Sequence, residues 1–350
     1  MEFALTEEQE ELVSTVRSLL TKRADSAAVR AASTSESGHD PALWQLLVEQ
    51  IGAAALAVPE EHGGAGFTLF ETLLILEEVG RSLAPSPLLA SVLTSEALLA
   101  TSNPDSALLE PLAAGTLGTV ALAGHTVTAR QDGEGWVLEG TATNVLEADQ
   151  AEVLLVVAGT DAGPALFVVD PAEARPTWVP SMDQALRIGD IAFSATPARL
   201  LAADATAVAA RISQVGAAAT AALQVGVASR ALEMTVAYAK EREQFGRPIG
   251  SFQALKHRMA DMLVQVEMSR SASWAASYAV AHHTSEADRL AHVAKSYCGE
   301  ALEHVAAETV QLHGGIAITW EHDAHLVFKR AHALGQLFGT PLAHRAALAR

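Results

Sequence analysis

Cysteine, aromatic residues and positive charge are all scarce in this sequence. Cys298 is the only cysteine among the 350 residues, which excludes an internal disulfide framework and makes a cytoplasmic location the default expectation. Aromatic residues make up 5% of the chain, although half of the residues are hydrophobic and many of those are alanine. Alanine has a high helix propensity, so the composition favours a fold rich in closely packed helices.

Positive charge is outweighed by negative charge. The chain has 23 Lys and Arg residues against 41 Asp and Glu residues, which gives a net charge of −18. Such a chain is a poor candidate for binding nucleic acid or an anionic membrane. The first residues are acidic and do not resemble a signal peptide, and no apolar stretch approaches the ~20 residues of a membrane span. We therefore expect neither a nucleic-acid partner nor a membrane span.

Hydrophobic periodicity changes twice along the chain and predicts an α+β fold with three domains. Residues 1–114 predict an N-terminal helical domain, and long helices in residues 203–350 predict a C-terminal four-helix bundle. Between them, residues 115–202 contain short β-rich runs separated by turns such as Gly133–Gly135, which predict a small antiparallel, barrel-like β domain. A loop or frayed helix is expected at residues 24–40. The predicted helices cover residues 6–22, 41–51, 68–82, 88–100, 203–241, 252–283 and 285–312, and a last one begins near Trp320. Thr6 and Gln9 predict a capping box at the start of the first of these helices.

Residues 242–253, Arg-Glu-Gln-Phe-Gly-Arg-Pro-Ile-Gly-Ser-Phe-Gln, interrupt the helical pattern with a tight polar corner. Gly and Pro would suffice to turn the chain, but this segment also carries arginine and two glutamines. A guanidinium can bind a diphosphate through paired, charge-assisted hydrogen bonds, and an amide both donates and accepts. The segment predicts a site for an anionic, hydrogen-bonding ligand; the alternative is a Gly/Pro corner with solvated polar side chains.

A second motif, Gln-Leu-His-Gly-Gly-Ile-Ala-Ile-Thr, follows at residues 311–319, and Glu321-His322 and Lys329-Arg330 come after it. Together with residues 242–253 and the order α, β, α, these motifs resemble the acyl-CoA dehydrogenase family over almost the whole chain. The resemblance implies an FAD enzyme that removes hydrogen from Cα and Cβ of an acyl-CoA thioester. It also implies that the FAD lies between the β domain and the bundle and reaches across a dimer interface.

The resemblance assigns a role in FAD binding to residues of both motifs. Arg242 and Gln244 would hold the pyrophosphate of an FAD shared with a neighbouring subunit. Glycine admits close approach of the backbone to such a ligand. The remaining implied contacts are Phe245, Phe252 and Gln253 on the adenosine side, completed by Gln311, Gly314 and Gly315.

The catalytic base of the family has no counterpart in this sequence. Many members carry a glutamate followed by Gly-Thr after the Gly-Gly motif, but here Phe338 precedes Gly339-Thr340. Other members place the base on the first helix of the bundle, which here has no acidic residue between Asp204 and Glu233. We expect Glu233 to face outward, so the sequence assigns no catalytic residue.

The flavin-ring motif of the family's β domain is also missing, and residues 144–146, Asn-Val-Leu, replace a later ring contact. The chain therefore resembles the base-lacking subunit of actinobacterial α2β2 acyl-CoA dehydrogenases, some of which degrade steroids. The expected partners are an acyl-CoA substrate, a homologous subunit or a second copy in a homotetramer, and an electron acceptor such as electron-transfer flavoprotein. Two alternatives remain open: a structural homologue without turnover, and a flavin-dependent monooxygenase on the same fold.

Three other features carry less weight. Glu321-His322-x-x-His325 lacks a third metal ligand, so we expect interface or solvent-facing histidines and no metal site. Cys298 has no activating base nearby in sequence and predicts a buried structural thiol. The Gly-rich residues 59–66 lack the flanking strand and Lys-Ser/Thr of a phosphate loop and predict a turn.

Overall fold

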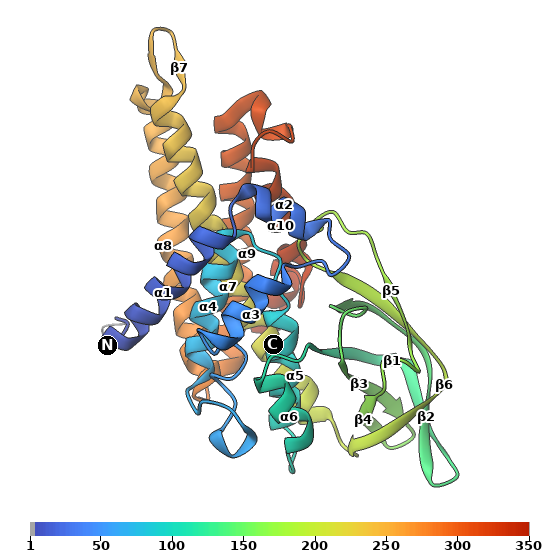
Figure 1. The fold of residues 1–350 in the computed structure, drawn as a ribbon. Helices are drawn as coiled ribbons and strands as arrows, with labels where there is room; N and C mark the ends of the chain where they lie inside the picture. The colour runs from blue at the N-terminus through green and yellow to red at the C-terminus, as the bar shows by residue number, and fades with distance from the viewer. Residues whose placement is uncertain (1–3, 350) are drawn as a thin grey trace. The chain divides into compact units, whose positions relative to one another are not determined.

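The computed structural model describes residues 4–349 (Figure 1). The chain packs into two compact units, each built from separated stretches of sequence. Unit 1 comprises Met1–Ala31, Leu69–Ala84 and Ala217–Arg350, and unit 2 comprises Ala32–Thr68 and Pro85–Gly216. The α+β class with helices, then a β region, then helices is confirmed. The division into domains 1–114, 115–202 and 203–350 stays a prediction.

Unit 1 is helical. The capping box predicted at the start of α1 (Glu7–Arg23) is present, because the Thr6 hydroxyl accepts from the Gln9 backbone and the Gln9 side chain accepts from the Thr6 backbone. At residues 24–40, where a loop or frayed helix was expected, the structure has the helix α2 (Ser26–Ser33) followed by a loop. The other helices are α4 (Leu69–Ser82), α7 (Thr206–Glu241), α8 (Gln253–Ala281), α9 (Ala287–His313), α10 (Ala324–Gln336) and α11 (Pro341–Leu348).

The C-terminal helices of unit 1 differ from the prediction in two places. The helix expected from about Trp320 begins only at Ala324 as α10, and α11 was not predicted. The start of α11 has a clear local cause, since the Thr340 hydroxyl accepts from the Ala343 backbone and Pro341 occupies the first turn.

Helices α4 and α7 cross at backbone contact. A Cβ atom placed on Gly226 of α7 would lie 1.9 Å from the carbonyl oxygen of Glu77 in α4. In the same crossing, a Cβ on Gly80 of α4 would lie 2.3 Å from the carbonyl oxygen of Leu223. Because real Cβ atoms do not approach backbone atoms so closely, both positions require glycine.

Helix α7 is long and apolar. By length and hydropathy α7 could cross a membrane, contrary to the expectation from the sequence. However, 94% of its most apolar 18-residue stretch is buried inside the protein. A helix that is apolar all round and covered on all sides is typical of the centre of a helical core. Alanine and valine supply most of its buried surface, as the composition predicted.

Unit 2 contains a sheet in the order β2-β1-β3-β4-β6-β5, with an added β2–β6 pairing that closes it into a barrel (Figure 1). The Gly133–Gly135 hairpin is confirmed by the pairing of Asp132 with Gly135. The all-antiparallel prediction was wrong in one place, because β1 and β3 run parallel; β2 provides the crossover between them. The bounds are β1 Gly118–Asp132, β2 Gly135–Leu146, β3 Val153–Thr160, β4 Gly163–Val169, β5 Arg175–Trp178 and β6 Ile188–Ala202.

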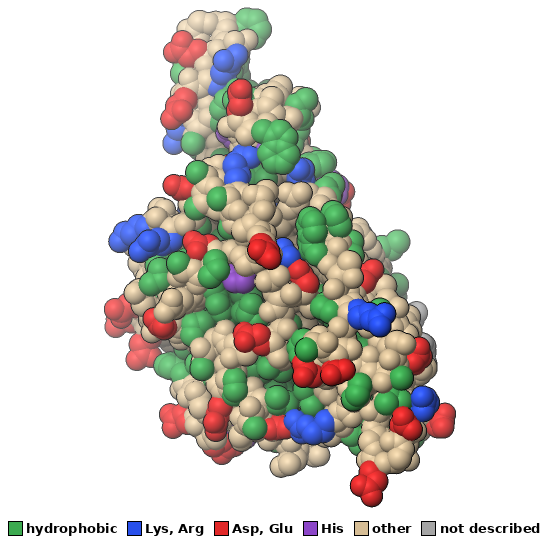
Figure 2. Space-filling view, turned by 45° about the vertical axis from the view of Figure 1, so that its right-hand side comes forward, with side chains coloured by type: hydrophobic (Ala, Val, Ile, Leu, Met, Phe, Trp, Pro, Cys, Tyr) green, Lys and Arg blue, Asp and Glu red, His purple; other side chains and the backbone are tan. Residues whose placement is uncertain are grey.

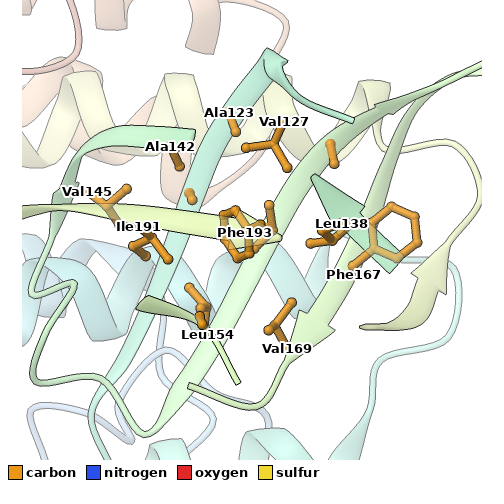
Figure 3. Packing of buried hydrophobic residues seen from close by; sticks show 14 of the residues in the cluster. Ala123, Val127, Leu138, Ala142, Val145, Leu154, Phe167, Val169, Ile191 and Phe193 are labelled. Atoms are coloured by element: carbon orange, nitrogen blue, oxygen red, sulfur yellow. The ribbon is translucent and has the colours of Figure 1, made fainter. Parts of the chain in front are cut away.

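The inside of this barrel is filled by small and branched side chains around Phe167 and Phe193 (Figure 3). Period-2 alternation within the strands directs these residues inward. The helices of unit 2 are α3 (Pro41–Glu49), α5 (Leu88–Leu99) and α6 (Ser106–Ala113), together with the first part of α7. The short α6 and β5 were not predicted.

Candidate functional site

The corner at residues 242–253 is a β-hairpin. After α7, strands β7 (Glu243–Gln244) and β8 (Arg247–Pro248) pair, and they extend beyond the ends of α7 and α8 (Figure 1). The two turn residues, Phe245 and Gly246, have φ values of 53° and 76°, which is the geometry of a tight hairpin turn. The backbone of Ile249 donates to the Arg242 carbonyl at 2.8 Å and closes the base of the hairpin.

The hairpin presents its polar and aromatic side chains to solvent. Arg242 and Gln244 are exposed, and Arg242 makes no ion pair among residues 4–349. The Phe245 side chain is 93% exposed and meets Phe252 edge-on, with 6.1 Å between ring centroids. The Arg247 guanidinium lies 4.0 Å from the centre of the Phe252 ring. These hairpin side chains therefore lie outside the hydrophobic core of unit 1.

Gln253 begins α8 directly after the hairpin. Its side-chain nitrogen lies 3.2 Å from Nε2 of His257, one helical turn further on. The contact orients the amide, so Gln253 faces solvent with a defined geometry.

The second motif lies at the C-terminal end of α9, which packs beside the end of α7. The Thr235 hydroxyl of α7 donates to the Thr309 hydroxyl of α9 at 3.1 Å, and Tyr238 stacks on His313 with ring centroids 4.5 Å apart. An ion pair between Arg258 and Glu308 connects α8 to α9 at the same end. The structure thus brings both sequence motifs to the same end of unit 1.

Gln311, Gly314 and Gly315 are exposed at this end. Gly314 has a φ of 64°, and a Cβ on either glycine would meet nothing within 4 Å. The backbone here faces open space, as close approach by a ligand requires.

His313, between these residues, was not singled out from the sequence. It is buried, and its Nδ1 lies 2.7 Å from the Thr309 carbonyl oxygen, so that nitrogen carries the proton. The Nε2 atom is left as an acceptor without a hydrogen-bond partner among residues 4–349. Burial lowers the pKa of His313, and the neighbouring His322 lowers it further.

Phe338, which the sequence resemblance aligned with the family's glutamate, follows α10 in a left-handed conformation with φ of 54°. Two side chains fix this segment: His344 Nε2 lies 2.9 Å from the Phe338 carbonyl oxygen, and Lys295 Nζ donates to the Gly339 carbonyl at 2.9 Å. Lys295 is fully buried, and desolvation lowers its pKa to about 8. Glu233 is exposed and pairs with Arg81 at 2.6 Å, which confirms that it faces outward.

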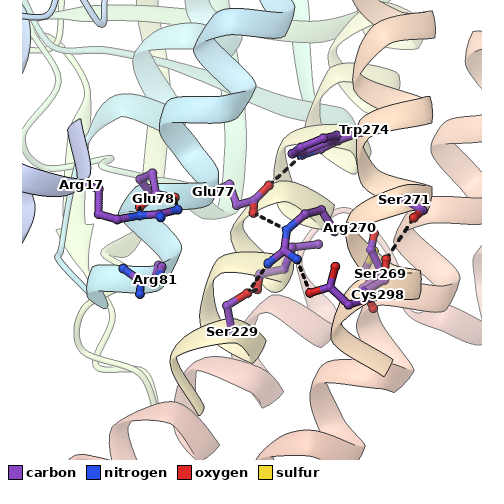
Figure 4. Close-up of polar contacts among 12 residues, drawn as sticks. Arg17, Glu77, Glu78, Arg81, Ser229, Ser269, Arg270, Ser271, Trp274 and Cys298 are labelled. Atoms are coloured by element: carbon purple, nitrogen blue, oxygen red, sulfur yellow. Dashed lines mark hydrogen bonds and ion pairs between the residues drawn. The ribbon is translucent and has the colours of Figure 1, made fainter. Parts of the chain in front are cut away.

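A polar network that the sequence did not reveal joins α4, α7 and α8 (Figure 4). Glu77 accepts from the Arg270 guanidinium at 3.2 Å and from the Trp274 indole at 3.0 Å, and Arg270 also donates to the Ser229 hydroxyl at 2.9 Å. Burial raises the pKa of Glu77, and Arg270 opposes that rise. The network lines a cavity of about 350 Å³ whose opposite wall includes Arg17 of α1.

Cys298 lies nearby in α9. It is buried, and its thiol donates to the Ser269 carbonyl at 3.4 Å. Burial raises the pKa of this thiol to about 12, which confirms the expected structural role. Among residues 4–349, no group of three or more His, Cys, Asp or Glu side chains could hold a metal ion.

Unit 2 contains a buried carboxyl group beside residues 144–146, where the resemblance led us to expect a replaced flavin-ring contact. Glu147 follows β2 with a φ of 50°, and its Oε2 has no hydrogen-bond partner in the described part of the chain. Burial raises the pKa of Glu147 to about 8, although Arg187 opposes the rise. Arg187 is itself bound by Asp149, with Nε 2.8 Å from Oδ1.

Comparison with protein families gives two matches that together cover most of the chain. Residues 6–116 match the N-terminal domain of acyl-CoA dehydrogenases, and residues 193–350 match their C-terminal domain. Among characterised relatives, the acyl-CoA dehydrogenase IpdE2 of Mycolicibacterium smegmatis is 42% identical over 340 residues, with 96% of each chain covered. IpdE2 of Mycobacterium tuberculosis is also 42% identical, over 336 residues covering 96% of this chain and 94% of that one.

Two solved structures share the fold. The steroid acyl-CoA dehydrogenase Tcur3481–Tcur3483, solved as a G363A variant, is 35% identical with a TM-score of 0.89, covering 98% of this chain and 97% of that one. The ChsE4–ChsE5 complex from Mycobacterium tuberculosis is 30% identical with a TM-score of 0.91, covering 100% and 98% of the two chains.

Proposed function

Because this chain belongs to the acyl-CoA dehydrogenase family, we propose that it is the subunit without the catalytic base in a two-component, FAD-dependent acyl-CoA dehydrogenase. The observation that carries the proposal is the contrast within the chain. Arg242, Gln244, Gln311, Gly314 and Gly315, which the resemblance assigns to an FAD shared between subunits, are exposed. Phe338 stands where the resemblance would place the base. The IpdE2, Tcur3481–Tcur3483 and ChsE4–ChsE5 likenesses favour an acyl-CoA from steroid catabolism.

The FAD-binding residues fit the diphosphate and adenosine of the cofactor. Arg242 is exposed and makes no ion pair within the part of the chain that the structure describes, so its guanidinium is available to a pyrophosphate. Gly314 and Gly315 leave open space for close approach, and Gln311 and Gln253 offer amides that donate and accept. Bound FAD would supply the hydride acceptor for the β-hydrogen of the substrate.

The missing chemistry is proton removal from the α-carbon, which needs a carboxylate near the substrate. The part of α7 between Ala217 and Leu232 has no acidic residue, and Glu233 is held outward by Arg81. A homologous partner chain in an α2β2 assembly would supply the base and the flavin-ring pocket. The electron acceptor that we propose for the assembly is an electron-transfer flavoprotein.

Reconstitution tests this division of labour. The chain purified alone is expected to show no dehydrogenation, because it lacks the base. It is expected to carry little flavin, because the partner chain supplies the flavin-ring pocket. Mixing or co-expressing it with a homologous chain that has glutamate at the position of Phe338 is expected to restore flavin absorbance and turnover of an acyl-CoA. The partner chain alone is the control. Full flavin loading and turnover by the lone chain would sink the proposal, and a loaded complex without turnover would favour a non-catalytic homologue.

Arg242→Ala is expected to weaken FAD binding by the reconstituted complex roughly 30-fold, since a hydrogen bond to a charged group contributes about 2 kcal/mol. Arg242→Lys should recover part of the loss, because lysine keeps the charge but not the paired geometry. FAD titration of the apo-complex measures both. Arg289→Ala, which removes an exposed arginine paired with Glu286 in α9, is the matched control. Equal affinities for the Arg242 and Arg289 variants would contradict the assignment.

A further inference from the structure

The junction between α10 and α11, residues 337–340, is held in place by side chains of neighbouring helices. Lys295 Nζ of α9 donates to the Gly339 carbonyl at 2.9 Å, and His344 Nε2 of α11 lies 2.9 Å from the Phe338 carbonyl oxygen. Lys295 and His344 are both buried. Two buried polar side chains therefore bind backbone that belongs to neither a helix nor a strand.

The backbone of the junction adopts a conformation that depends on these contacts. Phe338 has a φ of 54°, in the left-handed region that a phenylalanine rarely occupies, and Gly339 has a φ of 104°. A non-glycine residue in that region persists only where the surrounding structure fixes it. A Cβ atom on Gly339 would lie 3.0 Å from His344 Nε2, so the imidazole packs directly against the junction. Loss of the His344 contact would therefore let the junction relax.

His344 is itself fixed by a second histidine. Its Nδ1 lies 2.7 Å from Nδ1 of His292 in α9, which is a hydrogen-bond distance. Because Nε2 of His344 faces the Phe338 carbonyl oxygen, that nitrogen carries the proton of the neutral ring. Nδ1 of His344 is then the acceptor, and Nδ1 of His292 is the donor. The neutral histidine pair thus shares one proton between its rings.

The geometry limits the number of protons that the histidine pair can hold. One additional proton fits on Nε2 of His292, which lies 3.7 Å from Asp288 Oδ2. A second additional proton would occupy Nδ1 of His344 and set two N–H groups against each other across the 2.7 Å contact. Because a protonated imidazole has no acceptor nitrogen, the contact between the two rings must break at this step.

The surroundings of His344 oppose that second proton while α11 is docked. Burial lowers the pKa of His344 most, and the charges of Lys295 and His292 lower it further. The Phe338 carbonyl and the Asp288 carboxylate act in the opposite direction. The charged groups that act on His344 thus lie in α9, whereas the junction contributes a backbone carbonyl.

Once α11 is released, the chain as a whole favours proton uptake. The net charge is −18, and Figure 2 shows acidic side chains spread over the face that it draws. A negative field stabilises a protonated histidine that is exposed to it. Arg345 of α11 and Glu300 of α9 form an ion pair across the same contact, so these two charges offset each other.

We propose that the His292–His344 pair is a pH-sensitive switch that docks α11 on α9 and releases it when both histidines are protonated. At neutral pH the docked pair fixes the junction. Helix α11 has eight residues and is too short to be stable as an isolated helix, so release unfolds the chain from residue 337 onward. The inference goes beyond the proposed function, because it involves neither FAD nor the catalytic base.

The direction of the pH dependence follows from the neutral state of docked His344. Docking is fully favoured above the ordinary histidine pKa of about 6.5. Below that value the released state binds more protons than the docked state, so the equilibrium constant for release rises about tenfold for each pH unit. The rise ends where the pH falls below the lowered pKa of docked His344.

Hydrogen exchange of the full chain, followed by mass spectrometry from about pH 7.5 to about pH 4.5, tests the switch. After correction for intrinsic exchange rates, protection of residues 337–349 is expected to fall about tenfold per pH unit below about pH 6.5, while that of α7 stays constant. His292→Asn is expected to abolish the fall, because an uncharged amide can either donate to or accept from Nδ1 of His344. His304→Asn removes an exposed histidine of α9 and is the matched control, which should behave as the wild type does.

His344→Ala provides a second test, since α11 should then be released at every pH in this range. Loss of protection that is confined to residues 337–349 in the wild type and absent in His292→Asn supports the switch. Constant protection of the wild type overturns it, as does an equal loss in His292→Asn or full protection in His344→Ala. A loss that extends over α7 at the same pH shows general acid unfolding and also overturns it.

Discussion

Replacing Gly226 by alanine is expected to lower the thermal midpoint of the protein by roughly 4 °C, equivalent to about 3 kcal/mol of stability. The added Cβ would lie 1.9 Å from the Glu77 carbonyl oxygen and 2.6 Å from the Arg81 backbone nitrogen. Both are helix backbone atoms and cannot rotate away, so α4 and α7 must separate. That separation would also pull Glu77 away from Arg270 and Trp274. Differential scanning calorimetry measures the loss.

Gly335→Ala provides the matched control. Gly335 is also a helical glycine, in α10, but a Cβ there would meet nothing within 4 Å. Alanine is the better helix former by roughly 0.5–1 kcal/mol, so this variant should melt at or slightly above the wild-type temperature. If the Gly226→Ala variant melted at the same temperature as the Gly335→Ala variant, α4 and α7 would not cross at backbone contact.

Glu147→Gln is expected to remove most of the pH dependence of stability of unit 2. The buried carboxyl group has a pKa of about 8 in the folded chain and about 4.5 when unfolded. Because the folded state holds the proton more tightly, the contribution to stability is fully present below the lower pKa. It is lost as the pH rises through about 8, by up to about 5 kcal/mol. Glutamine stays neutral, so the variant should be the more stable protein at alkaline pH.

Urea unfolding at several pH values between the two pKa values measures this difference. Glu152→Gln is the control, because Glu152 is an exposed carboxylate five residues further along the same connection. Its stability profile should follow that of the wild type. Parallel profiles for wild type and Glu147→Gln would show that the Glu147 carboxyl group is solvated or paired in solution.

Elements with a strong local signal were predictable from the sequence. The Thr6–Gln9 capping box gave the start of α1, and the Gly133–Gly135 turn gave the β1–β2 hairpin. The short α6 and β5 have no such signal: α6 contains Pro111, which opposes a helix prediction, and β5 has only four residues. The parallel β1–β3 pairing depends on strand order, which no local pattern specifies.

In the candidate site, too, residues marked by a local sequence motif were predictable, whereas contacts between residues far apart in sequence were not. The residues of the two motifs were identifiable because arginine, glutamine and glycine recur there in a specific order. The hairpin conformation of residues 243–248 was not predictable, because a phenylalanine such as Phe245 is uncommon in the left-handed region. The Glu77–Arg270 pair joins residues 193 positions apart, and nothing near either residue indicates the other. The contact between His292 and His344 spans 52 positions and depends on packing that the sequence does not show.

Unit 1 is assembled from three separate stretches of chain, and this sets the order of events on the ribosome. Helices α2 and α4 are synthesised long before segments that contact them: Arg270 follows Glu77 by 193 residues, and Asp323 follows Arg30 by 293. Helix α4 can pack on α1 at once, but the parts of α2 and α4 that contact the later segments have no native surface to bury against during that interval. Unit 2 is fully translated by Gly216, whereas unit 1 needs the last helices. The nascent chain must therefore keep its first helices from aggregating until synthesis ends, a task suited to chaperones.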